Sequence, residues 1–155
     1  MLGVMSVVIR DAVLADMTML RDVFQRSSLS NVDDRANILA HPEVLEYSDE
    51  WVRRGCTRVA TDDGRGILGF ATAVPIDNTL ELEDLFVDPD WMRQGVGRAL
   101  IGDVVARARS ANVRRVDVTA NPHAFEFYRA VGFVLDGDAD TRFGPASRMH
   151  LDVTP

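Results

Sequence analysis

Residues 80–100 constrain the fold more than any other part of this 155-residue chain, because they join a strand pattern to a helix pattern. Leu80 and Leu82 alternate with glutamates, as in a strand with one buried face. The alternation slips at Asp84-Leu85, and a slip of one residue is what a β-bulge produces. From Val96 onward, apolar residues recur at helical spacing. The stretch therefore predicts a strand, a tight loop and a helix.

The loop between this strand and helix contains two glycines one residue apart, Gly95 and Gly97. Glycines let a ligand approach the backbone closely, and the first N–H groups of a helix point outward without helical partners. Together with the helix dipole, these groups form a site for a phosphate or pyrophosphate. Arg93 and Arg98 flank the loop and would add cationic contacts. A plain turn before a helix has the same pattern, so the loop alone leaves both interpretations open.

Two familiar phosphate-binding patterns fit poorly. The chain contains no lysine, which excludes a P-loop because that loop needs a lysine for its phosphates. A dinucleotide-binding fingerprint wants three glycines after the first strand of a βαβ unit, whereas this chain has two glycines in mid-chain.

Composition narrows the classes of partner and compartment. The net charge of −7 disfavours a general binder of nucleic acid or of anionic membranes. The apolar runs are too short to span a bilayer, and no signal peptide is expected at the start. A single cysteine, Cys56, rules out an internal disulfide and suits a reducing cytoplasm. The histidines show no metal-ligand spacing, so no metal is expected, and one domain is predicted over residues 1–155.

The rest of the chain alternates between helix and strand patterns. Strands are expected at residues 7–9, 57–60, 67–75, 79–87, 113–120, 133–135 and 149–153, and helices after residue 16 and at 32–40, 96–110 and 124–131. Asp16 is expected to cap the first helix, and residues 27–31 to end it. Residues 62–66 predict a hairpin turn, and residues 136–142 a Gly/Asp-rich loop. Residues 29–51 are interpreted either as a helical flap or as one wall of a substrate pocket.

A second motif follows the fifth strand pattern: Asn121-Pro122-His123-Ala124-Phe125-Glu126-Phe127-Tyr128, and then Gly132-Phe133. Together with the strand–loop–helix stretch and the order of elements, it resembles the GNAT superfamily of N-acetyltransferases. The resemblance implies an α/β (α+β) fold whose mixed, mostly antiparallel central sheet is splayed at the bulged strand and flanked by helices.

The resemblance also implies acetyl-CoA as the acyl-donor cosubstrate. The residues that would cradle its pyrophosphate are Arg93, Gln94, Gly95, Val96, Gly97 and Arg98. The pantetheine arm would run along Leu85, Phe86 and Val87, and Asn121 would hydrogen-bond it or nearby backbone. The family loop usually has Gln or Arg three residues before its first glycine. Here that position is Met92, and the backbone cradle does not depend on its side chain.

Acetyl transfer to an amine needs a base, oxyanion donors and a proton for the leaving thiolate. Glu81 is the first candidate for the base and Glu83 the second, while Asp84 would line the pocket. A water chain to any of them would also serve, and a solvated strand face is the structural alternative. Tyr128 is the expected acid, and the backbone N–H of Phe86 the expected oxyanion donor.

The predicted function is therefore transfer of an acetyl group to a primary amine of a small molecule or peptide, by direct attack in a ternary complex. The alternative is a non-catalytic acyl-CoA-binding or regulatory module of the same fold. An extended sheet edge is compatible with a homodimer. Arg142 and Phe143 are interpreted either as bordering the acceptor site or as exposed loop residues. The pattern leaves the acceptor, the acyl length and the oligomeric state open.

Overall fold

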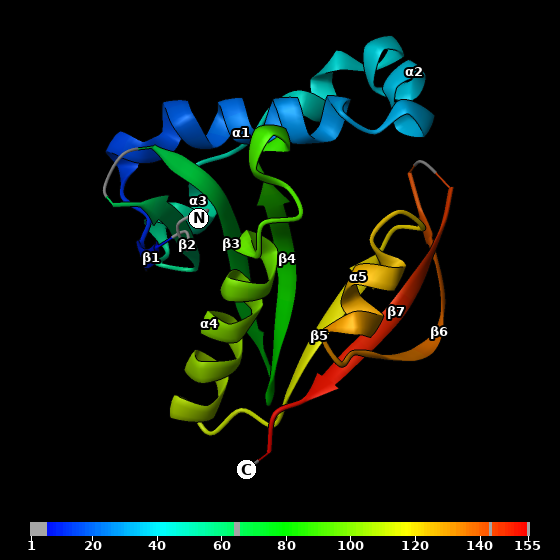
Figure 1. Cartoon of the computed structure of the whole chain (residues 1–155). Coiled ribbons are helices and arrows are strands. Elements are labelled where there is room, and N and C mark those ends of the chain that lie inside the picture. The colour runs from blue at the N-terminus through cyan, green and yellow to red at the C-terminus, as the bar shows by residue number, and fades with distance from the viewer. Residues whose placement is uncertain (1–5, 64–65, 143, 155) are drawn as a thin grey trace, which may run out of the picture. The chain divides into compact units, whose positions relative to one another are not determined.

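The computed structural model describes residues 6–63, 66–142 and 144–154 (Figure 1). Their elements, in chain order, are β1 (Val7–Asp11), η1 (Leu14–Asp16), α1 (Met17–Leu29), α2 (Val32–Ala40), η2 (Pro42–Leu45), α3 (Glu50–Arg53), β2 (Thr57–Asp62), β3 (Ile67–Ile76), β4 (Thr79–Val87), η3 (Pro89–Trp91), α4 (Val96–Ser110), β5 (Arg115–Ala120), α5 (Phe125–Ala130), β6 (Val134–Thr141) and β7 (Gly144–Asp152).

The strands form a seven-stranded sheet in the order β1-β2-β3-β4-β5-β7-β6. β2 pairs antiparallel with β1 and β3, and β7 with β5 and β6, whereas β4 and β5 are parallel. A mixed, mostly antiparallel sheet flanked by helices is the predicted fold, and the prediction is confirmed. The register between β4 and β5 covers Thr79 to Leu82, and β4 continues to Val87. The bulge near Asp84 stays a prediction.

The chain divides into two compact units. Unit 1 contains the described residues up to Thr72 together with Asp84–Leu100. Unit 2 contains Ala73–Glu83 and the described residues from Ile101 onward. β3, β4 and α4 each contribute residues to both units. The prediction of one functional domain over residues 1–155 stays a prediction.

The core of unit 1 is built by α1, β2 and β3. Leu20 and Val23 on α1 are buried with Val59 on β2 and Phe70 on β3. The spacing of the apolar residues along α1 gives the helix one apolar stripe, which faces this core. Around the edge, the rings of four partly or fully buried aromatic residues lie 5.0 to 5.5 Å apart, centroid to centroid: Phe24, Tyr47, Phe70 and Phe86.

One local prediction for α1 is corrected. Asp16 does not cap the helix through its side chain; its carboxylate accepts from the Val13 N–H at 2.8 Å and pairs with Arg10. The prediction that residues 27–31 end the helix is confirmed, because α1 ends at Leu29. The end comes at Ser30, whose hydroxyl donates to the Ser27 carbonyl.

The hairpin predicted at residues 62–66 joins β2 and β3, which are antiparallel neighbours as expected. Gly64 and Arg65 lie outside the described residues.

Unit 2 is built around β5 and β7. Val116, Val118 and Ala120 are the buried alternate residues of β5, and Met149 is buried on β7. Figure 1 shows α5 in front of β5 and β7. The chain enters this helix from β5 and leaves it at Gly132, whose φ of +110° suits a residue without a side chain.

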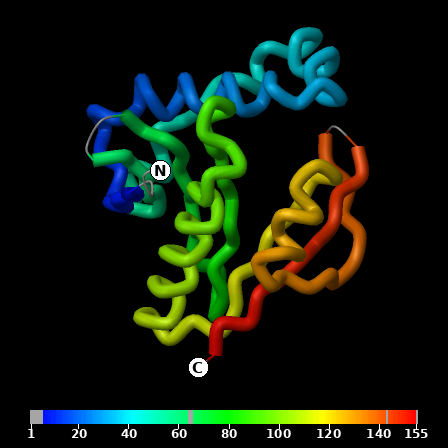
Figure 2. The backbone as a smooth tube through the Cα atoms, viewed as in Figure 1, coloured from blue at the N-terminus to red at the C-terminus, as the bar shows by residue number. Residues whose placement is uncertain are grey.

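The last hairpin corrects a further prediction. Residues 136–142 were expected to form a loop, but β6 runs to Thr141 and pairs with β7 as far as Gly144 (Figure 2). Most side chains of β6 are exposed, so the strand lacks the apolar alternation by which strands are recognised. Acidic residues suit an exposed edge strand, because their charge discourages pairing with another chain.

Candidate active site

The glycine loop of unit 1 has the geometry of an anion-binding helix start. Gly95 has a φ of +88°, and its carbonyl accepts the first helical hydrogen bond of α4, from the Ala99 N–H at 3.0 Å. The N–H groups of the next three residues, 96–98, therefore precede the helical ladder. A Cβ added to Gly95 would meet no atom within 4 Å, so the backbone here faces open space. Arg93 and Arg98 are exposed beside it.

Gly69 on β3 lies close to the end of β4 and to the start of α4, next to this loop. A Cβ at this residue would lie 2.7 Å from the Phe86 carbonyl oxygen and 3.2 Å from Cγ1 of Val96. The missing side chain therefore lets β3 approach both the end of β4 and the start of α4. Gly69 is a functional residue not predicted above, although a lone glycine within a strand signals such a close approach.

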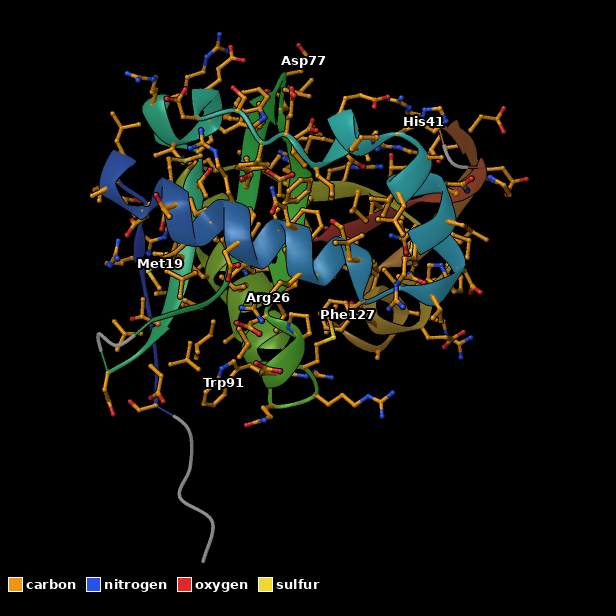
Figure 3. All side chains as sticks on the ribbon, turned by 90° about the horizontal axis from the view of Figure 1, so that it is seen from above. Met19, Arg26, His41, Asp77, Trp91 and Phe127 are labelled. Carbon is orange, nitrogen blue, oxygen red and sulfur yellow. The ribbon has the colours of Figure 1, made fainter. Side chains whose placement is uncertain are left out.

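An ion pair fixes the end of β4 to α1 within unit 1. Both Nη atoms of Arg26 donate to the buried carboxylate of Asp88. Figure 3 shows Arg26 pointing from α1 toward the segment that carries Trp91. Asp88 also accepts from the Asp90 N–H at 2.9 Å and so caps the short helix η3. Burial alone would raise the pKa of Asp88, but the hydrogen bonds from Arg26 and Asp90 outweigh it and lower that pKa.

The residues expected along the pantetheine arm occupy the last three positions of β4. Leu85, Phe86 and Val87 are half-buried. The Phe86 ring packs at 5.0 Å from the Phe24 ring and at 5.5 Å from the Phe70 ring, centroid to centroid. This packing holds the strand end in one position.

Asp84, just before these residues, accepts a hydrogen bond from a chain of hydroxyl groups. The Tyr47 hydroxyl donates to Oδ2 of Asp84 at 2.5 Å and lies 3.4 Å from the hydroxyl of Thr72. Thr72 in turn lies 2.9 Å from the hydroxyl of Thr57, and both threonines are buried. Burial raises the pKa of Asp84, and hydrogen bonds from Tyr47 and Thr72 offset part of that rise.

In unit 2, Glu81 is held by an arginine from β7. Arg148 donates from Nη1 to Oε1 of Glu81 at 2.5 Å and from Nη2 to Oε2 at 3.3 Å. Arg148 also donates to the Thr119 hydroxyl at 2.8 Å. This partner lies 67 residues away along the chain, so no local pattern around Glu81 predicts it. Glu83, the second predicted base, is exposed on the same strand.

Tyr128 lies on α5 and is only 6% exposed. Its ring packs edge-on against Phe127 and Phe133, with centroids 5.3 and 5.2 Å away. Asn121, at the start of this segment, accepts from the Ala124 N–H at 2.9 Å through its side-chain oxygen. Its amide NH2 group carries two further donors, as any asparagine does.

Described residues of unit 1 line at least two hollows. One, of about 490 Å³, is bounded by Thr18, Met19, Asp22, Val23, Arg26, Asp62, Gly66, Ile67, Leu68, Asp88 and Trp91. The other, of about 800 Å³, is bounded by Arg21, Gln25, Pro42, Glu43, Leu45, Glu46, Tyr47 and Ser48. Residues 42–48 border the second hollow, and both interpretations of residues 29–51 stay predictions.

Within the described part of the chain, no cluster of His, Cys, Asp and Glu has the form of a metal site. No helix among these residues is long and apolar enough to cross a membrane. Arg142 is exposed, and Phe143 lies outside the described residues.

Comparison with known proteins agrees with this geometry. A family model described as "Acetyltransferase (GNAT) family" matches residues 20–133. The uncharacterized N-acetyltransferase ycf52 of Porphyra purpurea is 29% identical over 140 residues, which cover 79% of this chain and 76% of the relative. The protein of the same name from Gracilaria tenuistipitata var. liui is 27% identical over 112 residues. This chain spans 62% of the length of that relative.

Among solved structures, the chain is similar to the PaiA N-acetyltransferase of Thermoplasma acidophilum, crystallised in complex with coenzyme A. The TM-score is 0.78 at 18% sequence identity, and the match covers 96% of this chain and 99% of the other. At that identity the likeness shows the fold.

Proposed function

This chain belongs to the acetyltransferase (GNAT) family, and we propose that it transfers an acetyl group from acetyl-CoA to a primary amine of a small molecule or peptide. The observation that carries the proposal is the start of α4. There, Gly95 has left-handed backbone, faces open space and precedes three N–H groups of the first helical turn. An anionic pyrophosphate is the ligand that such a helix start favours.

The residues around this loop would contact two parts of acetyl-CoA, its pyrophosphate and its pantetheine arm. The backbone of Arg93, Gln94, Val96, Gly97 and Arg98 would surround the pyrophosphate together with Gly95, and the two arginines would add charge. Leu85, Phe86 and Val87 would pair with the pantetheine arm as an added strand does. The structure of the Thermoplasma acidophilum protein, which contains coenzyme A, supports this donor.

The chemistry requires a neutral amine, a stabilised oxyanion and a protonated thiol. The backbone N–H of Phe86 is proposed to donate to the developing oxyanion. Tyr128 is proposed to protonate the departing sulfur, because a phenol with a reference pKa of about 10 carries its proton at neutral pH. The packing of the Tyr128 ring between two other aromatic rings supports this role, since it restricts the direction of the hydroxyl.

The sequence assigns removal of the amine proton to Glu81, or to Glu83, either directly or through water. Asn121 would hydrogen-bond the pantetheine through its amide group. In the balanced reaction, an ammonium and the thioester give an amide, a free thiol and one proton. The proton therefore leaves through a base, and an acidic residue on β4 fits that need.

A screen of primary amines tests the function directly. Thiol release from acetyl-CoA is measured with each amine, and acetyl-CoA binding is measured by isothermal titration calorimetry. We expect binding and amine-dependent release. Binding without release for any amine would point to the non-catalytic acyl-CoA-binding module. Binding of NADH but not of CoA would overturn the assignment of the loop.

A further inference from the structure

Asp84 on β4 is a partly buried acid whose hydrogen-bond partners are neutral hydroxyl groups. Tyr47 lies in the segment between η2 and α3, and it reaches β4 to donate to Asp84 at 2.5 Å. β3 and β2 contribute Thr72 and Thr57, which continue the chain of hydroxyls. Three separate parts of unit 1 therefore converge on one carboxylate.

The hydrogen bond from Tyr47 attaches the segment between η2 and α3 to the sheet, and this attachment does not require an acidic residue. An amide oxygen would accept the hydrogen bond of Tyr47 equally well and would avoid the desolvation of a charged group. A carboxylate that is partly removed from water without a cationic partner costs stability, and groups of this kind are concentrated at functional sites. Among the described contacts of Asp84, the partners are hydroxyl groups.

We propose that Asp84, held in position by Tyr47, receives the ammonium group of the acceptor and takes its proton before the amine attacks the thioester. This inference rests on the proposed acetyltransferase function and assigns the base of that reaction. Asp84 lies two residues before Phe86, whose N–H is proposed to stabilise the oxyanion. The carboxylate accepts one proton of the ammonium, and the neutral amine forms the new C–N bond as the C–S bond breaks. The second proton lost by the nitrogen balances the proton with which the thiolate leaves as a free thiol.

The other two acids of β4 are less suited to this step. Both carboxylate oxygens of Glu81 already accept hydrogen bonds from Arg148, so a substrate ammonium would have to compete with the guanidinium for them. Glu83 is exposed to solvent. Burial raises the pKa of Asp84, which makes it a stronger base than an ordinary aspartate.

The position of Tyr47 supports access by a substrate. The residue borders the hollow of about 800 Å³ in unit 1, whose charged lining consists of Glu43, Glu46 and Arg21. The acids outnumber the arginine, so a positively charged amine would be attracted to this lining. An acceptor seated in the hollow would contact the tyrosine that holds Asp84.

Asp84→Asn tests the proposal, with Asp77→Asn as the matched control in the exposed turn between β3 and β4. The probe is the amine that gives the fastest thiol release with the unaltered protein. We expect Asp84→Asn to lower kcat by about a hundredfold and to leave acetyl-CoA affinity within about twofold. Because the base must be unprotonated, kcat/KM should fall as the pH drops through its pKa, and Asp84→Asn should remove this acid limb.

Tyr47→Phe supplies a second readout. Tyr47 is the titratable side chain that the structure shows in contact with Asp84, and β2, β3 and α1 bring threonine and phenylalanine side chains to the network. Loss of the phenol removes a hydrogen bond that stabilises the carboxylate, so the acid limb should move to higher pH. If Tyr47 has a purely structural role, Tyr47→Phe should lower the melting temperature and leave this acid limb at the same pH.

The outcomes separate this inference from the proposed function. No thiol release with any amine would overturn both. A second outcome is that the unaltered protein releases thiol while Asp84→Asn keeps kcat within about twofold and shows the same acid limb. That result would overturn the assignment of Asp84 and leave the proposed acetyltransferase function in place. If Asp84→Asn does not fold, the pH profile of Tyr47→Phe decides. A shift of its acid limb to higher pH supports the assignment of Asp84, and an unshifted acid limb overturns it.

Discussion

Both carboxylate oxygens of Glu81 accept hydrogen bonds from the guanidinium of Arg148, a residue that lies on β7 and is distant in the sequence. The strand register explains the meeting, because Glu81 is opposite Asp117 on β5, and Thr119 on β5 is opposite Arg148. Two strand pairings thus bring an acid and a base onto one face of unit 2. The hydrogen bond to Glu81 raises the pKa of Arg148, which keeps its charge at any working pH.

This pairing predicts the behaviour of Glu81→Gln. The variant should lower the free energy of unfolding by about 1 kcal/mol, because a half-exposed ion pair contributes no more than that. Turnover should stay within about tenfold and keep its acid limb, since the proposal assigns the base to Asp84. Glu50→Gln, which breaks the exposed pair between Glu50 on α3 and Arg54 just after it, is the matched control. A loss of about a hundredfold with the acid limb gone would return the base to Glu81.

Gly95→Glu is expected to block acetyl-CoA. A glutamate at this helix start would fill the open space in front of the backbone and repel a pyrophosphate, so the Kd should rise by about a hundredfold or more. Gly55→Glu is the control, because Gly55 also has a left-handed φ, of +74°, and open space around it. Calorimetric titration measures both variants. Equal affinities for acetyl-CoA in the two would refute the cradle.

Tyr128→Phe is expected to keep the fold and the cofactor, because the ring still packs against Phe127 and Phe133. Turnover should fall by about a hundredfold, the usual scale for one general acid. Steady-state thiol release, acetyl-CoA binding and the melting temperature give the three readouts. If turnover stays within twofold while chemistry is rate-limiting, Tyr128 contributes only packing.

Asp88→Asn tests the ion pair to Arg26. Because the pKa of Asp88 is lowered in the folded chain, its stabilisation is complete above the ordinary aspartate pKa of about 3.9 and is lost as the pH falls through the lower folded value. The variant should therefore unfold more easily at neutral pH, by about 1.5 to 3 kcal/mol, and the deficit should shrink in acid. Urea titrations at several pH values measure it. A deficit that is constant with pH would mean that the pair is not the cause.

The sequence alone predicted the elements whose signals are local. β4 and the helix from Val96 to Ser110 have the bounds that period and turn chemistry indicate, and α2 matches its predicted range of residues 32–40. The glycine loop was recognised for the same reason, since a helix start and its free N–H groups depend only on neighbouring residues. The family, too, followed from two contiguous motifs and the order of elements, and the family comparison confirms it.

The tertiary structure alone decided which side chains meet. Arg148 reaches Glu81, Arg26 reaches Asp88, and Tyr47 reaches Asp84 only after strands and helices have packed. Period and propensity describe how a residue relates to its neighbours in the chain, and they contain no term for partners tens of residues away. The ionic and hydroxyl partners of a carboxylate determine whether it is suited to act as a base, and these partners were set by strand register and helix packing. The sequence therefore determined the glycine loop at the helix start and the family of this protein, whereas the fold determined the partners of its acids.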